Sequence, residues 1–133
     1  MIRVLIADDE NLLRMALGSL LDLEETIDVV AQATNGTDAV ALVLEHQPDV
    51  VLLDLEMPGL DGIDAATAIL DERPGQAIIL LTRHARPGVL KRALKVGIRG
   101  FLAKTVDPER LAQVIGDVNS GLRYIDSEIS TAA

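Results

Sequence analysis

The sequence contains no cysteine and no tryptophan, and only one tyrosine and one phenylalanine among its 133 residues. Without cysteine the chain can form neither a disulfide framework nor a thiolate metal site, which fits a reducing compartment. Because aromatic residues make up only 2%, a core built from the 49% of hydrophobic residues must be aliphatic. No apolar run approaches the roughly 20 residues of a membrane span, and MIRVLIADDE is no signal peptide. We therefore expect one soluble, cytoplasmic domain with no membrane contact.

Basic residues are also scarce: 12 Lys and Arg face 21 Asp and Glu, which gives a formal net charge of −9. Direct binding to a nucleic-acid backbone depends on clustered Lys and Arg, so this balance argues against it. An acidic domain suits a cation or a basic partner, although most of the charge serves only solubility.

Short apolar segments alternate with segments of helical period along the chain. The predicted strands are Ile2 to Ala7, Val29 to Ala33, Val50 to Leu53, Ala77 to Leu81 and Arg99 to Ala103. The first, third and fourth are almost continuously apolar, which is typical of strands covered by helices on both faces of a parallel sheet. The more mixed second strand suits an edge. The pattern predicts an α/β fold, a doubly wound (βα)5 sheet with the third strand near its middle.

The helical stripes predict which faces are buried. In the last helix the stripe is Leu111, Val114, Ile115 and Val118. In the first helix it is Leu13, Ala16, Leu17, Leu20 and Leu21. Met15 falls nearly opposite that stripe and Leu12 lies at its edge, so both are candidates for an exposed apolar contact with a partner.

Polar residues follow four of the predicted strands. Asp8 and Asp9 follow the first, Asp54 the third, Thr82 the fourth and Lys104 the fifth. In such sheets these carboxyl ends share one crevice, where three carboxylates repel each other unless a hard cation such as Mg²⁺ joins them. Mg²⁺ with a lysine is a usual clamp on a transferring phosphoryl group, and a carboxylate can be the acceptor. Each residue alone is more often a cap or a solvated side chain; five at four strand ends indicate a site centred on Asp54.

Four motifs in this order resemble the receiver domains of bacterial two-component response regulators: DDE, LLDLEMPGLDG, LLTRHAR and GFLAKTVDPERL. The resemblance covers residues 1–121. It implies a flavodoxin-like receiver fold with strand order 2-1-3-4-5 and a sensor histidine kinase as partner. It also implies a signalling phosphoacceptor rather than an enzyme, one that catalyses only its own phosphorylation and dephosphorylation.

The same resemblance implies roles for individual residues. Asp54 would be the phosphoacceptor. Asp9 would bind Mg²⁺ (or Mn²⁺) directly, Asp8 mostly through water, and the Glu56 backbone carbonyl would be a further ligand beside Asp54. Glu56 and His84 occupy the two variable positions that tune the lifetime of the phosphate in this family.

Thr82 and Lys104 would bind phosphoryl oxygens, and Phe101 matches the aromatic switch residue that turns inward when Thr82 moves. The alternative for Phe101 is a plain core aromatic. Many receivers carry proline after the lysine, whereas this chain has Thr105. The sequence leaves open whether the Lys104–Thr105 peptide is cis or trans.

The segments ALGSLLDLEETIDVVAQATNG and GLRYIDSEI resemble the NarL/LuxR-type transcription regulators, and EMPG and ARPG resemble the branch that senses membrane fluidity and controls fatty-acid desaturation. This implies a receiver over 1–121 and, over 122–133, an arm that begins a linker to an absent helix-turn-helix DNA-binding domain. DNA would be bound only through that domain. We favour this over a stand-alone receiver. The implied output is a phosphorylation-dependent homodimer, with a helix 1–helix 5 face, including Leu12 and Met15, favoured over one at helix 4 and strand 5.

Three alternatives use other chemistry. A haloacid-dehalogenase-type phosphatase also has an aspartyl nucleophile, but it needs Asp where this chain has Glu56. A flavodoxin-like cofactor module would need a phosphate-binding loop after the first strand, where Asp8 and Asp9 would repel phosphate. A phosphate-independent interaction module would not need the acceptor, metal and clamp residues together. The kinase, its signal, the target genes and the phosphate lifetime are not encoded in any motif.

Overall fold

The computed structural model describes residues 1–84, 86 and 88–126. The strands are β1 (Ile2–Ala7), β2 (Ile27–Ala33), β3 (Val50–Asp54), β4 (Ala77–Thr82), β5 (Gly100–Ala103) and β6 (Tyr124–Ile125). The helices are α1 (Asn11–Asp22), α2 (Gly36–His46), α3 (Gly62–Glu72), α4 (Val89–Val96) and α5 (Pro108–Asn119). All pairings are parallel, in the order β2-β1-β3-β4-β5-β6. The predicted fold class and the order 2-1-3-4-5 are confirmed, and a sixth strand is added at the β5 edge.

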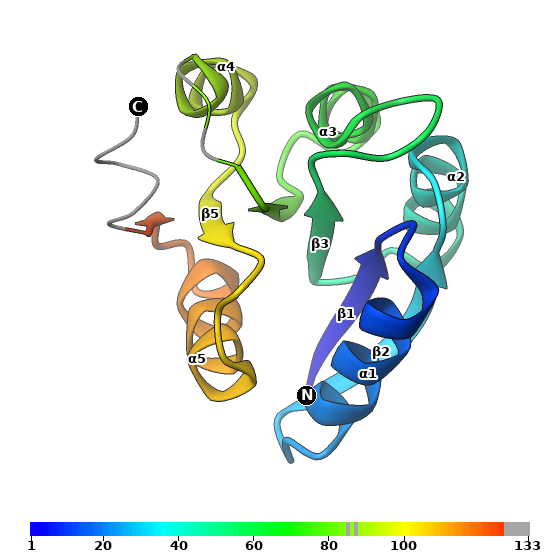
Figure 1. Cartoon of the computed structure of the whole chain (residues 1–133), viewed down its shortest axis with the longest axis vertical. Coiled ribbons are helices and arrows are strands. Elements are labelled where there is room, and N and C mark those ends of the chain that lie inside the picture. Colours follow the sequence, from blue (N-terminus) through cyan, green and yellow to red (C-terminus); the bar gives the residue numbers. More distant parts are fainter. Residues whose placement is uncertain (85, 87, 127–133) are drawn as a thin grey trace.

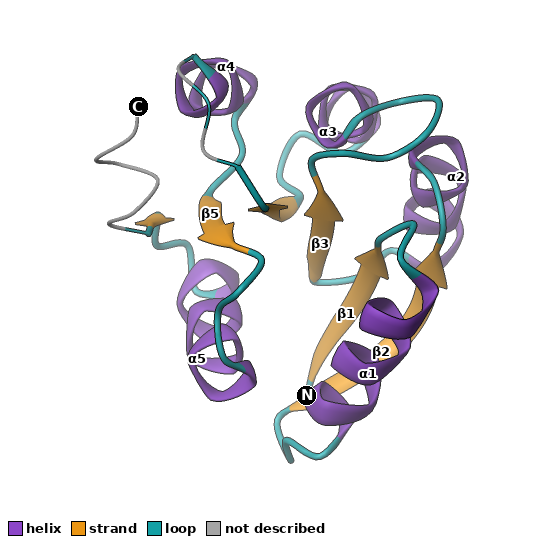
Figure 2. Ribbon diagram, in the orientation of Figure 1, coloured by secondary structure: helices purple, strands orange, loops and turns teal. Residues whose placement is uncertain are grey.

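Helices cover both faces of this sheet (Figures 1 and 2). Helices α1 and α5 pack on one face, where the core contains Leu21 of α1 and the whole predicted stripe of α5. Helices α2, α3 and α4 pack on the other face. Strand β3 is buried along its entire length between the two layers, which is why its sequence is almost continuously apolar. Among the described residues, no helix is both long enough and apolar enough to span a membrane.

The predicted buried stripe of α1 is wrong in part. Leu21 is fully buried as expected, but Leu20 is 45% exposed, whereas Arg14 and Gly18 face the sheet. The Arg14 guanidinium is held there by the Asp8 carbonyl and the side chain of Gln32, so a charged residue occupies a core-facing position. Apolar periodicity cannot find a helix face that is buried through hydrogen bonds.

The predicted C-terminal arm is ordered at its beginning. The backbone amide of Tyr124 donates to the carbonyl of Arg99 at 2.9 Å, and that of Asp126 donates to Phe101 at 2.8 Å, which forms β6. The Tyr124 ring lies 4.9 Å from the Arg110 guanidinium of α5. Residues 127–133, the rest of the predicted arm, lie outside the described residues.

Candidate functional site

The carboxyl ends of β1, β3, β4 and β5 meet at one edge of the sheet, as expected. The backbone amide of Asp8 continues the ladder to Ala33 at 3.0 Å, and that of Lys104 continues it to Thr82 at 2.9 Å. Asp54 is the last residue of β3, next to β4. The strand ladders therefore bring together side chains that are far apart in the sequence, and all five predicted strand-end residues lie at this edge.

Lys104 is the centre of the site. Its Nζ atom lies 3.0 Å from Asp54 Oδ2, 3.1 Å from Asp8 Oδ2 and 2.9 Å from Glu10 Oε1. The Lys104 side chain is only 5% exposed, and those of Asp8 and Asp54 are similarly buried. One ammonium thus bridges three carboxylates, and the site has a deficit of positive charge.

Burial and these contacts shift the proton affinities of the site. Burial raises the pKa of Asp54 from 3.8 to about 6, although its hydrogen bond to Lys104 acts in the opposite direction. For Lys104, burial by itself favours the neutral amine, but the hydrogen bonds to Glu10, Asp54 and Asp8 outweigh it and raise the pKa. Asp54 is therefore harder to ionise than an exposed aspartate, and added positive charge in this crevice would ease its ionisation.

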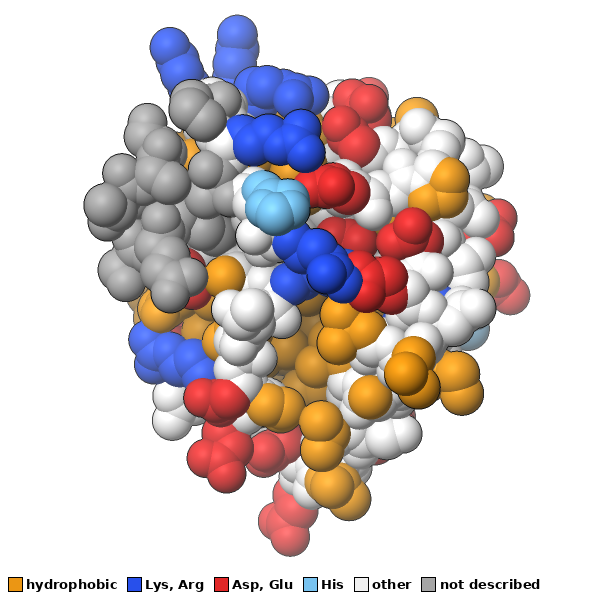
Figure 3. All heavy atoms as spheres, viewed as in Figure 1, with side chains coloured by type: hydrophobic (Ala, Val, Ile, Leu, Met, Phe, Trp, Pro, Cys, Tyr) orange, Lys and Arg blue, Asp and Glu red, His pale blue; other side chains and the backbone are white. Residues whose placement is uncertain are grey.

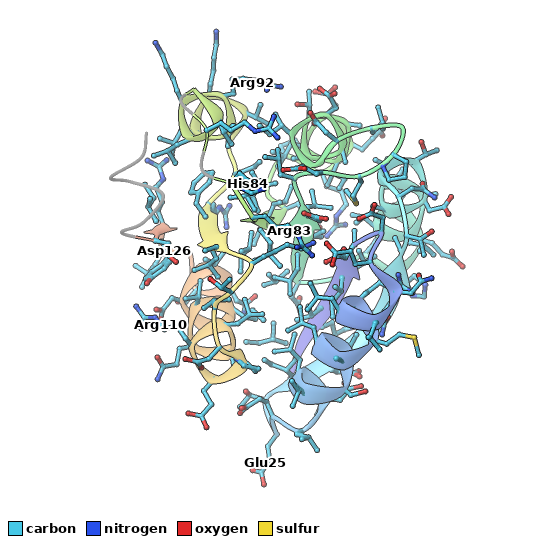
Figure 4. All side chains as sticks on the ribbon, viewed as in Figure 1. Glu25, Arg83, His84, Arg92, Arg110 and Asp126 are labelled. Carbon is cyan, nitrogen blue, oxygen red and sulfur yellow. The ribbon has the colours of Figure 1, made fainter. Side chains whose placement is uncertain are left out.

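Two residues of the site, Glu10 and Arg83, were not among those predicted. They form an ion pair that links the loop after β1 to the end of β4, and both side chains are partly exposed. Hydrogen bonds from Lys104 and then Arg83 lower the pKa of Glu10. Figure 4 shows Arg83 reaching toward the carboxylates at the start of α1. The sequence signal was that Glu10 and Arg83 directly follow predicted site residues; nothing local indicated that their side chains would meet.

A hollow of about 150 Å³ opens above Asp54. It is lined by Asp9, Glu10, Asp54, Glu56, Arg83 and Lys104. Within the described part of the chain, the Asp8, Asp9 and Glu10 carboxylates also form a group whose oxygens lie within 4.8 Å of one another. Such an all-oxygen donor set, with carboxylates that repel each other, fits a hard divalent cation such as Mg²⁺ and no soft metal.

The hydroxyl of Thr82 is engaged with the loop that follows it. Thr82 is buried, and its Oγ1 donates to the His84 carbonyl at 2.9 Å and accepts from the His84 amide at 3.2 Å. Thr82 is not among the residues that line the hollow above Asp54. The side chain of His84 is exposed, so only its backbone takes part in this arrangement.

The other predicted residues lie around this centre. Glu56 is exposed beside the hollow, and its carboxylate lies 3.5 Å from Arg86 of the β4–α4 loop. Phe101 is 1% exposed and is already inside the core. The peptide bond between Lys104 and Thr105 is trans.

Leu12 and Met15 lie on α1, outside the crevice, and are 84% and 58% exposed. A separate groove runs between α1 and α5, where apolar side chains gather below the charged centre in Figure 3; its apolar lining includes Leu13, Ala16, Leu17, Leu20, Val106, Pro108 and Leu111. Neither Leu12 nor Met15 lines this groove. The dimer-face assignment of these two residues stays a prediction.

Comparisons with known proteins agree with this geometry. Residues 4–116 match the family model described as the response regulator receiver domain. The chain is 46% identical over 129 residues to the transcriptional regulatory protein DesR of Bacillus subtilis, an alignment that covers 97% of this chain and 64% of that protein. It is 35% identical to the response regulator GacA of Pseudomonas aeruginosa, over 98% of this chain and 61% of that protein. The chain thus spans about two thirds of the curated relatives it matches.

Solved structures support the same family assignment. A LuxR-family two-component response regulator from Aurantimonas superposes with a TM-score of 0.93 at 29% identity, covering 99% of this chain and 94% of that one. The receiver domain of the response regulator NarL from Mycobacterium tuberculosis superposes with a TM-score of 0.86 at 33% identity, over 90% and 97%. With the strand ends, the lysine-bridged carboxylates and these matches in agreement, the chain belongs to the response regulator receiver domain family.

Proposed function

We propose that this chain accepts a phosphoryl group on Asp54 from a phosphohistidine of a sensor histidine kinase. The observation that carries the proposal is the buried Asp54 carboxylate at the end of the central strand, 3.0 Å from Lys104 and open to the hollow. A carboxylate oxygen of Asp54 attacks phosphorus and forms a new O–P bond. The P–N bond to the histidine breaks, and the imidazole leaves with its electron pair and takes up a proton. Lys104 stays beside the acceptor and stabilises the negative charge on the phosphoryl oxygens.

The proposed reaction needs a divalent cation, Mg²⁺ or Mn²⁺. Asp8, Asp9 and Asp54, with the Glu56 carbonyl, would hold it, and when bound it would screen the phosphoryl oxygens from the carboxylates. The raised pKa of Asp54 is consistent with this, because a bound cation would stabilise the ionised carboxylate in a site where burial disfavours it.

Activation would release Thr82 from its own loop. To donate to a phosphoryl oxygen, the Thr82 hydroxyl must give up the bond to the His84 carbonyl. That rearrangement would move the β4–α4 loop and bias a two-state equilibrium that neighbouring helices report. Phe101, which pairs with Leu80 across β4 and β5, would be the aromatic switch residue that turns inward when Thr82 moves. Its ring is already buried, so the inward position needs no further movement, and this burial equally fits a plain core aromatic.

The output would be a homodimer that acts through a DNA-binding domain of the full regulator, in the cytoplasm. The groove between α1 and α5 supports the α1–α5 face over one at α4 and β5. The NarL/LuxR-type relatives support transcription control. The EMPG and ARPG motifs support the branch that controls fatty-acid desaturation.

The proposal is tested by intact mass after incubation with acetyl phosphate and Mg²⁺. We expect one phosphoryl adduct in the wild type, and no adduct either without Mg²⁺ or in Asp54→Asn. An adduct that persists in Asp54→Asn would disprove the assignment of the acceptor. Glu56→Ala and His84→Ala should form the adduct but lose it at altered rates; decay equal to wild type would remove their tuning role.

A further inference from the structure

Arg83 is the second cation of the crevice, and the roles derived above leave it unused. It directly follows Thr82, yet its side chain turns back over the hollow to reach Glu10 in the loop after β1. Its guanidinium is close enough to Asp54 and Asp8 for their charges to raise its pKa as well, after the larger effect of Glu10. Arg83 is therefore a cation beside the acceptor, attached to a different strand from Lys104.

Glu10 connects these two cations. Its Oε1 accepts from Lys104, whereas its Oε2 accepts from Arg83. One carboxylate thus holds both positive groups with two separate oxygens, and all three residues line the hollow together with Asp54. A phosphoryl group on Asp54 would offer three oxygens and nearly two negative charges to the same two cations.

The competition favours the phosphoryl group. Charge-assisted bonds from arginine to phosphate are short and often bidentate, because the planar guanidinium presents several donors in one plane. Glu10 is partly exposed and regains hydration when it is released, so its loss of Arg83 has a small cost.

We propose that Arg83 pairs with Glu10 in the unphosphorylated state and exchanges Glu10 for a phosphoryl oxygen on phosphorylation. In that position the guanidinium would block the approach of water to phosphorus and slow hydrolysis. The inference rests on the proposed phosphorylation of Asp54. In the hydrolysis that Arg83 slows, water attacks phosphorus, the P–O bond to Asp54 breaks, and the Asp54 carboxylate leaves with the electron pair while inorganic phosphate is released. Arg83 is a positioning residue that binds the product of phosphotransfer and limits the approach of water.

The test is the decay of the adduct. The chain is phosphorylated with acetyl phosphate and Mg²⁺, the donor is removed, and the remaining adduct is followed by intact mass. We expect Arg83→Gln to lose its phosphoryl group about threefold to fivefold faster than wild type, the scale of one partly exposed charge contact, and Arg83→Lys to fall between them. Arg99→Gln is the matched control: Arg99 lies at the opposite edge of the sheet, bonded to the Gly75 carbonyl, and its variant should decay like wild type.

A second variant separates this role from a structural one. Glu10→Gln weakens the hold on Arg83, so its adduct should decay more slowly than wild type, and this slowing should vanish when Arg83→Gln is also present. Equal decay of wild type and Arg83→Gln, or the same effect of Glu10→Gln in both backgrounds, would overturn the inference and leave the proposed function intact. Absence of any adduct in the wild type would overturn both.

Discussion

At the scale of single residues, the site is governed by a shortage of positive charge. Lys104 faces the carboxylates of Asp8, Glu10 and Asp54. Arg83 pairs only with Glu10 among the ion pairs of the described residues, at the edge of the crevice. Removing one partner from such a buried cluster leaves the others uncompensated, which is costly, whereas adding a cation relieves the repulsion. Burial first, and then the neighbouring Asp8 charge, raises the pKa of Asp54, so Asp54 holds its proton more tightly than an exposed aspartate.

Asp54 should make the free energy of unfolding depend on pH. Its pKa of about 6 in the folded chain lies above the ordinary 3.8, so the folded state binds this proton more tightly than the unfolded state. Stability from this group is therefore present at low pH and is lost as pH rises through about 4 to 6. Without divalent cations, we expect Asp54→Asn to be more stable than wild type at pH 7, by about 1–3 kcal/mol, and by much less at pH 4.

Denaturant unfolding at several pH values measures this difference. Asp28→Asn, a change at an exposed position of β2, is the control and should track wild type. A gain in Asp54→Asn that is the same at pH 4 and pH 7 would contradict the argument, because it would then come from packing rather than from ionisation.

At the scale of elements, the site depends on how closely α3 approaches the end of β3. A Cβ atom on Gly62, at the start of α3, would lie 2.5 Å from the Asp54 carbonyl oxygen and 3.0 Å from the Leu55 Cα. Both are backbone atoms and cannot yield as a flexible side chain would. This glycine therefore lets the helix begin directly behind Asp54.

Gly62→Ala should destabilise the chain by about 1–3 kcal/mol, since the added methyl overpacks a fully buried position. Gly116→Ala in α5 is the matched control: a Cβ there meets nothing within 4 Å, so the better helix propensity should stabilise by up to about 1 kcal/mol. Denaturant unfolding checks both. Equal effects of the two changes would show that the approach of α3 to Asp54 is not restrictive.

At the scale of the whole molecule, the apolar groove between α1 and α5 lies directly beside the site. The groove between α1 and α5 includes Leu20, and it also reaches Asp8 and Lys104 at the floor of the crevice. A second copy seated along α1 and α5 would bury this groove. A change at Lys104 on phosphorylation is thus directly next to the surface proposed to dimerise.

Leu20→Asp should weaken the proposed phosphorylation-dependent dimer at least about tenfold. Burying a leucine contributes about 1.5–3 kcal/mol, and burying the introduced carboxylate would add a desolvation cost. Leu44→Asp, at an exposed position of α2 in the other helix layer, should leave the dimer unchanged. Sedimentation of the phosphorylated chains measures both. Met15→Asp tests the neighbouring predicted contact, and dimers that survive both α1 changes would exclude the α1 face.

Much of this architecture could be predicted because the chain repeats one simple pattern. The apolar runs of β1, β3 and β4 and the stripe of α5 reflect burial that depends only on local order, and the residues that follow each strand necessarily share one edge. The stripe of α1 was predicted wrongly in part, because Arg14 is buried through hydrogen bonds. Strand β6 was missed because a strand of two residues shows no hydrophobic periodicity.

The amino-acid sequence by itself determined the sheet, the strand-end positions of Asp8, Asp54, Thr82 and Lys104, and their common edge, because periodicity and topology depend on local order. Only the tertiary structure decided which charges pair across that edge. Glu10 and Arg83 are 73 positions apart, and their contact depends on how two loops bend above the sheet. Such loop contacts are set by long-range packing and electrostatics, on which no local pattern in the sequence reports.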